Sequence, residues 1–270
     1  MTTVAREAKL RCPKCRGGSV PFASAPTTEV RCGGCGAVFP VRDGVVDLLD
    51  GPDAPRTPSQ RLMESESVVR IYESRLWRRS AVAARLLGLA FEAEQEEIVR
   101  ALALGGDEAV LDVACGPGIY SRLLSRRVHR GRVVGLDVSR PMLRQARRRA
   151  SGEGGANLSF VRASALDLPS ADAAFDAVNC CGALHLFPDP GRALAEMSRV
   201  LVPGGRLALA VAREPARRYA ASAARALGVQ SLSKSRLESM LATAGLRPPT
   251  MLHEGGVWMI ASSGKPSVKA

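Results

Sequence analysis

The stretch Val110-Leu-Asp-Val-Ala-Cys-Gly-Pro-Gly118 decides the fold of this chain. Its apolar residues predict a buried strand, and its two glycines predict a sharp turn into a helix. Asp112 lies near the end of that strand. About twenty residues further on, the apolar segment Arg132-Val-Val-Gly-Leu-Asp137 ends in a second acid. A glycine turn followed at that spacing by an acid is typical of nucleotide-binding sites in doubly wound sheets, where the acid binds ribose hydroxyls.

Strand-like and helix-like segments alternate from residue 109 onwards, which predicts a mostly parallel sheet with helices on both faces. We therefore expect an α/β fold with a doubly wound, seven-stranded, Rossmann-like sheet. The last two strands are separated only by Gly255-Gly256 and should pair antiparallel. The expected strands cover 109–113, 132–137, 157–161, 174–180, 204–212, 247–253 and 256–262. The expected helices cover 118–129, 140–151, 190–201, 215–227 and 234–244.

Four cysteines near the N-terminus form two CxxC knuckles, Cys12-Pro-Lys-Cys15 and Cys32-Gly-Gly-Cys35, with 16 residues between them. Each knuckle directs two thiolates at one point, so the pair predicts a closed, structural Zn²⁺ site in residues 1–50. This segment has too little apolar material for a core of its own, and metal binding would supply its folding free energy. An iron site or a redox cysteine pair is the alternative.

Composition predicts the remaining domain boundaries. Residues 37–49 predict a hairpin that ends in an apolar segment able to dock on the main domain. Residues 51–58 are rich in Pro, Gly and Asp and predict a linker. Residues 59–108 predict a helical lead-in or cap, whose second helix runs from Phe91 to Leu104, and residues 109–270 form the main domain.

The formal net charge is +12, and most of the excess is arginine. A surface for the phosphate backbone of RNA is one interpretation, but a solvated face is favoured because no aromatic residues alternate with the arginines for base stacking. No apolar run reaches the roughly 18 residues of a membrane span, and the first residues lack the apolar core of a signal peptide. We expect a cytoplasmic protein without membrane contact, and the sequence does not predict its oligomeric state.

Several further motifs follow the glycine turn along the chain. They are Gly-Leu-Asp137-Val-Ser-x-x-Met142-Leu, Ala-Leu-Asp167-Leu-Pro, Phe175-Asp-Ala-Val, Ala-Leu-His185 and Glu196-Met-Ser-Arg-Val-Leu-Val-Pro-Gly-Gly205. With Asp112-x-Ala-Cys-Gly-Pro-Gly118 they resemble, in order, the motifs of class I S-adenosylmethionine-dependent methyltransferases of the type 11-like group. With its ribbon, the layout is similar to plant plastid methyltransferases of unknown substrate and, by architecture, to bacterial rRNA guanine-N1 methyltransferases. The resemblance implies S-adenosylmethionine rather than a dinucleotide.

The resemblance also implies roles for individual residues. Asp112 and the turn at 116–118 would face the methionine part of the cofactor, Asp137 the two ribose hydroxyls, and Met142 the adenine. Ser164 stands where the family often has an acid for the adenine amine, with the backbone N–H of Ala165 beside it. Ala114 replaces a glycine that many members have. The expected cofactor-binding residues are Tyr72, Asp112, Ala114, Gly116, Gly118, Asp137, Val138, Met142, Ser164, Ala165 and Cys180.

His185 is the candidate general base, because it follows the fourth strand at the edge where ligands bind. The alternative is that it only packs beneath the next loop. Asn179-Cys-Cys-Gly182 stands where an Asn-Pro-Pro-Tyr motif would mark methylation of exocyclic amino groups. Ring-nitrogen, oxygen and carbon acceptors therefore remain open.

The segment between the fifth strand and the helix at 234 is short for a substrate lid, which predicts an open site or one covered by the ribbon and a helix over 59–80. We expect methyl transfer to an O or C atom of a small molecule, such as a quinone-type or natural-product scaffold. One alternative is methylation of rRNA or tRNA bases, with the ribbon and the basic face holding the RNA. Another is a non-enzymatic scaffold whose ribbon docks a partner protein.

Overall fold

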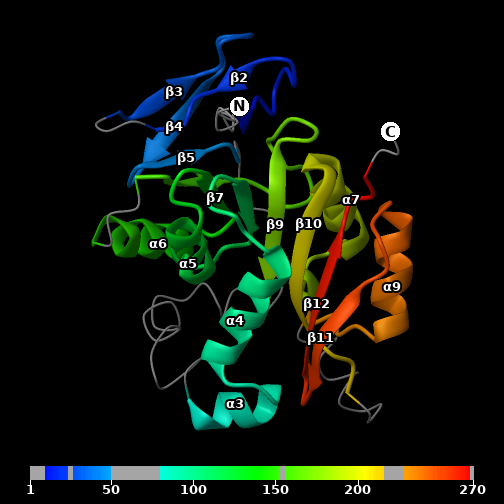
Figure 1. The fold of residues 1–270 in the computed structure, drawn as a ribbon. Helices are drawn as coiled ribbons and strands as arrows, with labels where there is room; N and C mark the ends of the chain where they lie inside the picture. The colour runs from blue at the N-terminus through cyan, green and yellow to red at the C-terminus, as the bar shows by residue number, and fades with distance from the viewer. Residues whose placement is uncertain (1–9, 24–26, 50–79, 153–155, 216–227, 268–270) are drawn as a thin grey trace.

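The computed structural model describes residues 10–23, 27–49, 80–152, 156–215 and 228–267 (Figure 1). The expected linker at 51–58, Tyr72 and the lead-in segment 59–79 lie outside these residues. So does the helix expected over 215–227, apart from its first residue. The helix expected from Phe91 is confirmed as α4 (Phe91–Leu102).

Among the described residues, ten strands form one sheet in the order β11-β12-β10-β9-β6-β7-β8-β5-β4-β3. Strands β6 to β10 pair in parallel, whereas β12 runs antiparallel between β10 and β11. The α/β fold and the antiparallel pairing of the last two strands are thus confirmed. The main-domain strands are β6 (Ala109–Val113), β7 (Arg132–Asp137), β8 (Leu158–Arg162), β9 (Phe175–Cys181), β10 (Leu201–Ala212), β11 (Thr250–Gly255) and β12 (Trp258–Gly264).

Helices cover both faces of this sheet because neighbouring strand residues point to opposite sides. Val110 joins a buried cluster with α4, α5 and α6, whereas Leu111 joins a second cluster with α7 and α9. Figure 1 shows α4, α5 and α6 on the near side of the sheet. The other described helices are α3 (Ala81–Leu87), α5 (Ile119–Arg127), α6 (Arg140–Gly152), the short η1 (Leu184–Leu186), α7 (Pro190–Val200) and α9 (Lys234–Thr243).

The N-terminal ribbon continues the main sheet instead of standing apart from it. Asp43 and Gly44 both have positive φ, at 53° and 74°, and make the tight turn of its last hairpin. The hairpin's second strand pairs in parallel with β8, so the expected docking of this segment is confirmed. The ribbon strands are β1 (Leu10–Arg11), β2 (Ser19–Val20), β3 (Glu29–Arg31), β4 (Val38–Arg42) and β5 (Val45–Asp47).

Within the described ranges, no helix has the length and apolar character needed to span a bilayer. The cytoplasmic location stays a prediction.

Gly135, in the middle of β7, supplies the first test of this packing. A Cβ atom placed there would lie 2.6 Å from the ring of Phe160 and 2.9 Å from Oγ of Ser121. We expect Gly135→Ala to lower the free energy of unfolding by about 1–3 kcal/mol, because the added methyl group overpacks the strand–helix contact. Urea denaturation followed by circular dichroism measures this change.

The matched control is Gly152→Ala, at the end of α6, where a Cβ atom would meet nothing within 4 Å. Its stability should equal or slightly exceed that of the wild type. A Gly135→Ala protein as stable as the wild type would contradict the close packing of β7 against α5 and β8.

Candidate active site and metal centre

The glycine turn after β6 wraps around the carboxylate of Asp137. Ala114, Gly116 and Gly118 have φ values of 53°, 53° and 77°, so the backbone curls at every second residue. The N–H of Gly116 donates to Oδ2 of Asp137 at 2.8 Å. The N–H of Ser139 donates to Oδ1 at 2.8 Å. These two bonds join the loop after β6 to the end of β7, which is why the acid and the glycines act together.

The two glycines of the turn have different functions. A Cβ atom at Gly116 would meet no atom within 4 Å, so this residue leaves open space beside the loop. A Cβ atom at Gly118 would lie 2.9 Å from Cβ of Ala146 and 3.2 Å from the ring of Phe160. Gly118 also caps the N-terminus of α5 without a side-chain hydrogen bond. Gly118 is therefore needed for helix packing, and Gly116 for access to the backbone.

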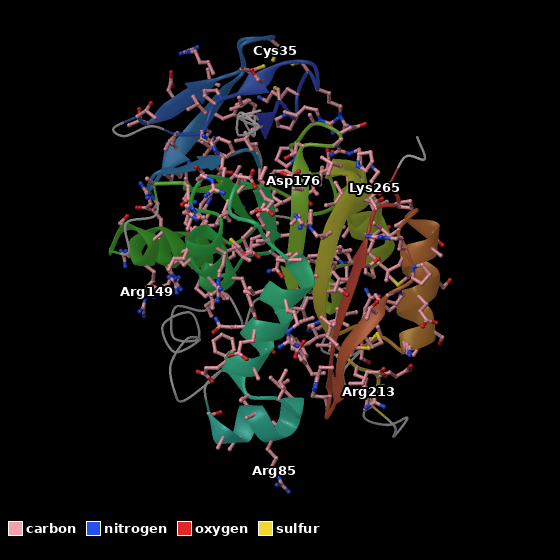
Figure 2. The ribbon with its side chains drawn as sticks, viewed as in Figure 1. Cys35, Arg85, Arg149, Asp176, Arg213 and Lys265 are labelled. Carbon is pink, nitrogen blue, oxygen red and sulfur yellow. The ribbon has the colours of Figure 1, made fainter. Side chains whose placement is uncertain are left out.

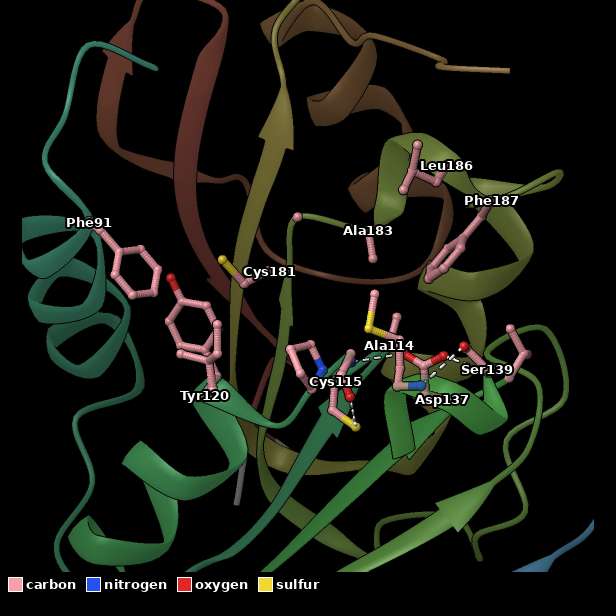
Figure 3. Close-up of a pocket in the computed structure, with 16 residues that line it drawn as sticks. Phe91, Ala114, Cys115, Tyr120, Asp137, Ser139, Cys181, Ala183, Leu186 and Phe187 are labelled. Carbon is pink, nitrogen blue, oxygen red and sulfur yellow. Dashed lines mark hydrogen bonds between the residues drawn. The ribbon is translucent and has the colours of Figure 1, made fainter. Parts of the chain in front are cut away.

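A cavity opens at the carboxyl ends of β6, β7 and β9 (Figure 3). The side chain of Asp137 faces it, while burial raises the pKa of this carboxyl group. The cavity is lined by the glycine loop, the starts of α5 and α6, the segment after β9, and one residue of α4. These residues are Phe91, Ala114, Cys115, Gly116, Pro117, Ile119, Tyr120, Asp137, Val138, Ser139, Met142, Cys181, Gly182, Ala183, Leu186 and Phe187.

Five expected cofactor residues line this cavity, and their contacts with the cofactor remain predictions. They are Ala114, Gly116, Asp137, Val138 and Met142. Among the described residues, none of the ribbon lines the cavity. The choice between an open site and one covered by the ribbon and a helix over 59–80 stays open, because residues 50–79 lie outside the described part of the chain.

Asp112 lies outside the cavity lining, and its contact with the methionine part of the cofactor stays a prediction. It is only 2% exposed and lies beneath the glycine turn. Its Oδ2 accepts a hydrogen bond from the hydroxyl of Ser121 at 2.5 Å, and its Oδ1 accepts one from the amide of Asn179 at 2.8 Å. Burial raises the pKa of Asp112 to about 6. Its carboxyl group therefore ties α5 to β9 from inside the protein.

Cys180, Ser164 and Ala165 also lie outside the cavity lining, and their cofactor contacts stay predictions. Because side chains alternate along a strand, Cys180 points into the core below β9, and its neighbour Cys181 lines the cavity instead. The hydroxyl of Ser164 accepts a hydrogen bond from the N–H of Leu166 at 3.1 Å. Neither Ser164 nor Ala165 is among the lining residues.

His185 lies in η1 with its ring turned away from the cavity lining, which does not support a role as base. Its side chain is 7% exposed, and its Nδ1 accepts a hydrogen bond from the N–H of Ala212 at 3.1 Å. The ring also packs edge-on against Trp258, with the ring centres 5.6 Å apart. His185 thus packs against Trp258 and accepts a hydrogen bond at the end of β10, and its role as a base stays a prediction.

The sequence analysis missed a polar group at the other end of the cavity. Tyr120 donates from its hydroxyl to Oε1 of Glu94 at 2.5 Å, and Cys181 donates from Sγ to the same oxygen at 3.4 Å. Phe91 packs edge-on against Tyr120, with ring centres 6.5 Å apart (Figure 3). Tyr120 follows the glycine turn directly and is one of three tyrosines in the chain, which is the signal that could have identified it.

The four ribbon cysteines converge at the outer end of the ribbon, where Figure 2 labels Cys35. All four sulfur atoms lie within 4.8 Å of one another. The Sγ atoms of Cys12 and Cys35 are 3.8 Å apart, as are those of Cys15 and Cys32. Sulfurs placed tetrahedrally about 2.3 Å from a zinc ion lie about 3.8 Å from one another, whereas a disulfide needs about 2.05 Å. This arrangement fits a four-thiolate metal site.

Backbone N–H groups favour the thiolate form at this centre. Those of Cys35 and Gly34 donate to the sulfur of Cys32, at 3.5 and 3.3 Å, and lower its pKa to about 6. The N–H of Gly18 similarly lowers the pKa of Cys15. Burial and the neighbouring cysteines instead raise the pKa of Cys35 to about 11. Because the thiolate is the form that binds metal, the backbone favours a cation at one cysteine of each knuckle, Cys15 and Cys32.

Comparison with known proteins agrees with this geometry. A family model described as a methyltransferase domain matches residues 110–205. The chain therefore contains a class I methyltransferase domain. It is 32% identical over 214 residues to an uncharacterised chloroplastic methyltransferase of Arabidopsis thaliana, a match that covers 73% of this chain and 59% of that protein.

Two further matches come from bacteria. A demethylmenaquinone methyltransferase of Thermus thermophilus is 42% identical over 122 residues, or 44% of this chain and 55% of that protein. The chain thus spans little more than half the length of these two relatives. The structure of an S-adenosylmethionine-dependent methyltransferase from Aquifex aeolicus shares the fold, with a TM-score of 0.57 and 20% identity over 74% of this chain and 97% of that one.

The metal centre predicts about one zinc ion per purified chain. We expect Cys32→Ala to lose the zinc and to lower the melting temperature by at least about 4 °C, because the ribbon core depends on the ion. Elemental analysis and thermal unfolding measure both. The control Cys181→Ala should keep its zinc, and a wild-type protein without zinc and with four reactive ribbon thiols would contradict the site.

The position of Asp137 predicts its effect on cofactor affinity. We expect Asp137→Ala to weaken binding of S-adenosylhomocysteine about 100-fold in calorimetry, because the ribose hydroxyls lose a charged acceptor. Affinity should also fall as the pH is lowered through the raised pKa of this group, since the protonated form loses acceptor capacity. Ser164→Ala, outside the cavity lining, should leave affinity unchanged, and equal binding by Asp137→Ala would refute the assignment.

Proposed function

We propose that this protein transfers a methyl group from S-adenosylmethionine to an oxygen or carbon atom of a small, largely apolar acceptor. The observation that carries the proposal is the division of the cavity into two ends (Figure 3). Asp137 and Met142 form one end, which suits a nucleoside. Phe91, Tyr120 and Cys181 form the other end, which is mostly apolar with one hydroxyl and one thiol.

The relative from Thermus thermophilus supports a quinone-type acceptor, since its name denotes methylation of demethylmenaquinone. A natural-product scaffold with a phenol or an activated ring carbon presents similar chemistry. A ring nitrogen is a less favoured acceptor. In this proposal the four ribbon cysteines hold one structural Zn²⁺ and take no part in methyl transfer.

S-adenosylmethionine, when bound, supplies an activated methyl group, so the chain has to align the acceptor and exclude water. An acceptor hydroxyl loses its proton as its oxygen bonds to the methyl carbon and the carbon–sulfur bond breaks. Tyr120 and Glu94 are placed to receive that proton: it passes to the oxygen of Tyr120 while the tyrosine proton moves to the carboxylate of Glu94. This pair takes the role first expected of His185.

RNA base methylation is the second candidate, favoured by the basic outer face of α6. Arg144, Arg148 and Arg149 are exposed on this helix, and Figure 2 labels Arg149 at its outer end. Such a face would bind phosphates with a strong dependence on salt. The apolar end of the cavity favours the small-molecule acceptor.

Transfer of a radiolabelled methyl group from S-adenosylmethionine tests the proposal. We expect the wild type to label a reduced naphthoquinone or a phenolic acceptor and to leave total RNA unlabelled. Tyr120→Phe should lower kcat about 100-fold, because the proton route is lost, while S-adenosylhomocysteine affinity stays within about threefold of wild type. Label in RNA alone would replace the proposal by its alternative, and no binding of S-adenosylhomocysteine would refute both.

A further inference from the structure

The metal ribbon places one of its own carboxylates deep inside the main domain. Strand β5 pairs with β8 so that Asp47 stands opposite Arg162. Their side chains are only 4% and 3% exposed. Nη1 of Arg162 lies 3.1 Å from Oδ1 and 3.2 Å from Oδ2 of Asp47. The ion pair therefore crosses from the ribbon to the methyltransferase sheet at a buried position.

The same arginine reaches the edge of the cofactor cavity. Its Nε donates to the carbonyl oxygen of Val138 at 2.8 Å. Val138 lines the cavity and lies between Asp137 and Ser139. The N–H of Ser139 donates to Oδ1 of Asp137. Directly after β8, the N–H of Ala163 donates to the carbonyl oxygen of Asp137 at 3.1 Å. The end of β8 therefore supports the loop that presents the expected ribose-binding carboxylate.

Asp47 also holds a second arginine at this loop. Nη2 and Nε of Arg140 lie 3.0 and 3.2 Å from Oδ2 of Asp47. Arg140 begins α6 directly after Ser139, so Asp47 contacts cations on both sides of the loop at 137–139. The N–H of Leu49 donates to Oδ1 at 3.1 Å and keeps the carboxylate oriented.

Charge balance makes Asp47 necessary at this position. A buried guanidinium that loses its counter-ion has to find another partner or draw in water. Burial raises the pKa of Asp137, and the charge of Arg162 opposes this rise, so the guanidinium already acts on the carboxylate that faces the cavity. Without Asp47, Arg162 would be free to leave the carbonyl of Val138, and the loop would lose its fixed position.

We propose that Asp47 is a positioning residue for the cofactor site: the ribbon's carboxylate fixes Arg162, which holds the Val138 carbonyl and with it the ribose-binding carboxylate of Asp137. The ribbon is thereby a part of the cofactor-binding unit instead of a separate docking module. The inference rests on the proposed function only in taking S-adenosylmethionine as the ligand.

Calorimetry with S-adenosylhomocysteine tests the inference on the full-length, zinc-loaded protein. We expect the isosteric change Asp47→Asn to weaken binding about 10-fold or more, because the loop position is lost. The matched control is Asp43→Asn, in the same hairpin. Asp43 forms an exposed ion pair with Arg144 of α6, at 3.4 Å. Asparagine tolerates the positive φ of this position. Its affinity should stay within about twofold of wild type.

A second ligand separates positioning from general destabilisation. The 2′-deoxyribose analogue of S-adenosylhomocysteine lacks one hydroxyl that Asp137 would bind. We expect the wild type to prefer the ribose form, and Asp47→Asn to lose most of this preference. General destabilisation would lower the affinity for both ligands by the same factor, and that result would overturn the proposal.

Arg140→Gln provides the same test should Asp47→Asn fail to fold, since Arg140 is a partly exposed partner of Asp47. We expect Arg140→Gln to lose about two- to fivefold in affinity, because only part of the contact is lost, and to show a reduced preference for ribose. Unchanged affinity and preference in these variants would overturn the inference. Absence of binding to the wild type would instead refute the proposed function, so the two failures are distinguishable.

Discussion

The site depends on the pair of backbone hydrogen bonds that the carboxylate of Asp137 accepts from Gly116 and Ser139. One comes from the loop after β6 and the other from the residue just before α6. A single side chain therefore links the loop after β6 to the loop after β7. Burial would make this charge costly without such donors. The left-handed turn, the open space at Gly116 and the cavity all follow from the need to bring these amides to the same acid.

A second constraint is the unpaired edge that a parallel sheet leaves at β8. The ribbon removes this edge by adding β5 in parallel, and its own buried residues join the core beneath the sheet. The four-cysteine cluster and the cavity faced by Asp137 therefore share one continuous sheet, although the cysteines and Asp137 belong to separate motifs. The Asp47–Arg162 pair connects them because a buried charge requires a partner wherever the chain supplies one.

The sequence analysis was most successful where a pattern has a period or a fixed spacing. The alternation of elements predicted the sheet, and the two CxxC knuckles predicted sulfurs that converge to within 4.8 Å. It was least informative where a side chain's direction depends on its tertiary neighbours. Cys180 and Cys181 differ by one residue, yet only Cys181 lines the cavity, and the ring of His185 is held against Trp258. Residue type alone does not contain that information.

The sequence by itself determined the class I methyltransferase fold, the glycine turn with its acid, and the convergence of the four ribbon cysteines, because these depend on local conformation and on the order of the elements. Only the tertiary structure decided that Asp112 supports the turn from below, that Tyr120 meets Glu94, and that Asp47 meets Arg162 across 115 residues of chain. Such contacts join distant segments, and their geometry is set by how the strands pair and how the helices pack. The spacing of residues along the chain does not predict these contacts.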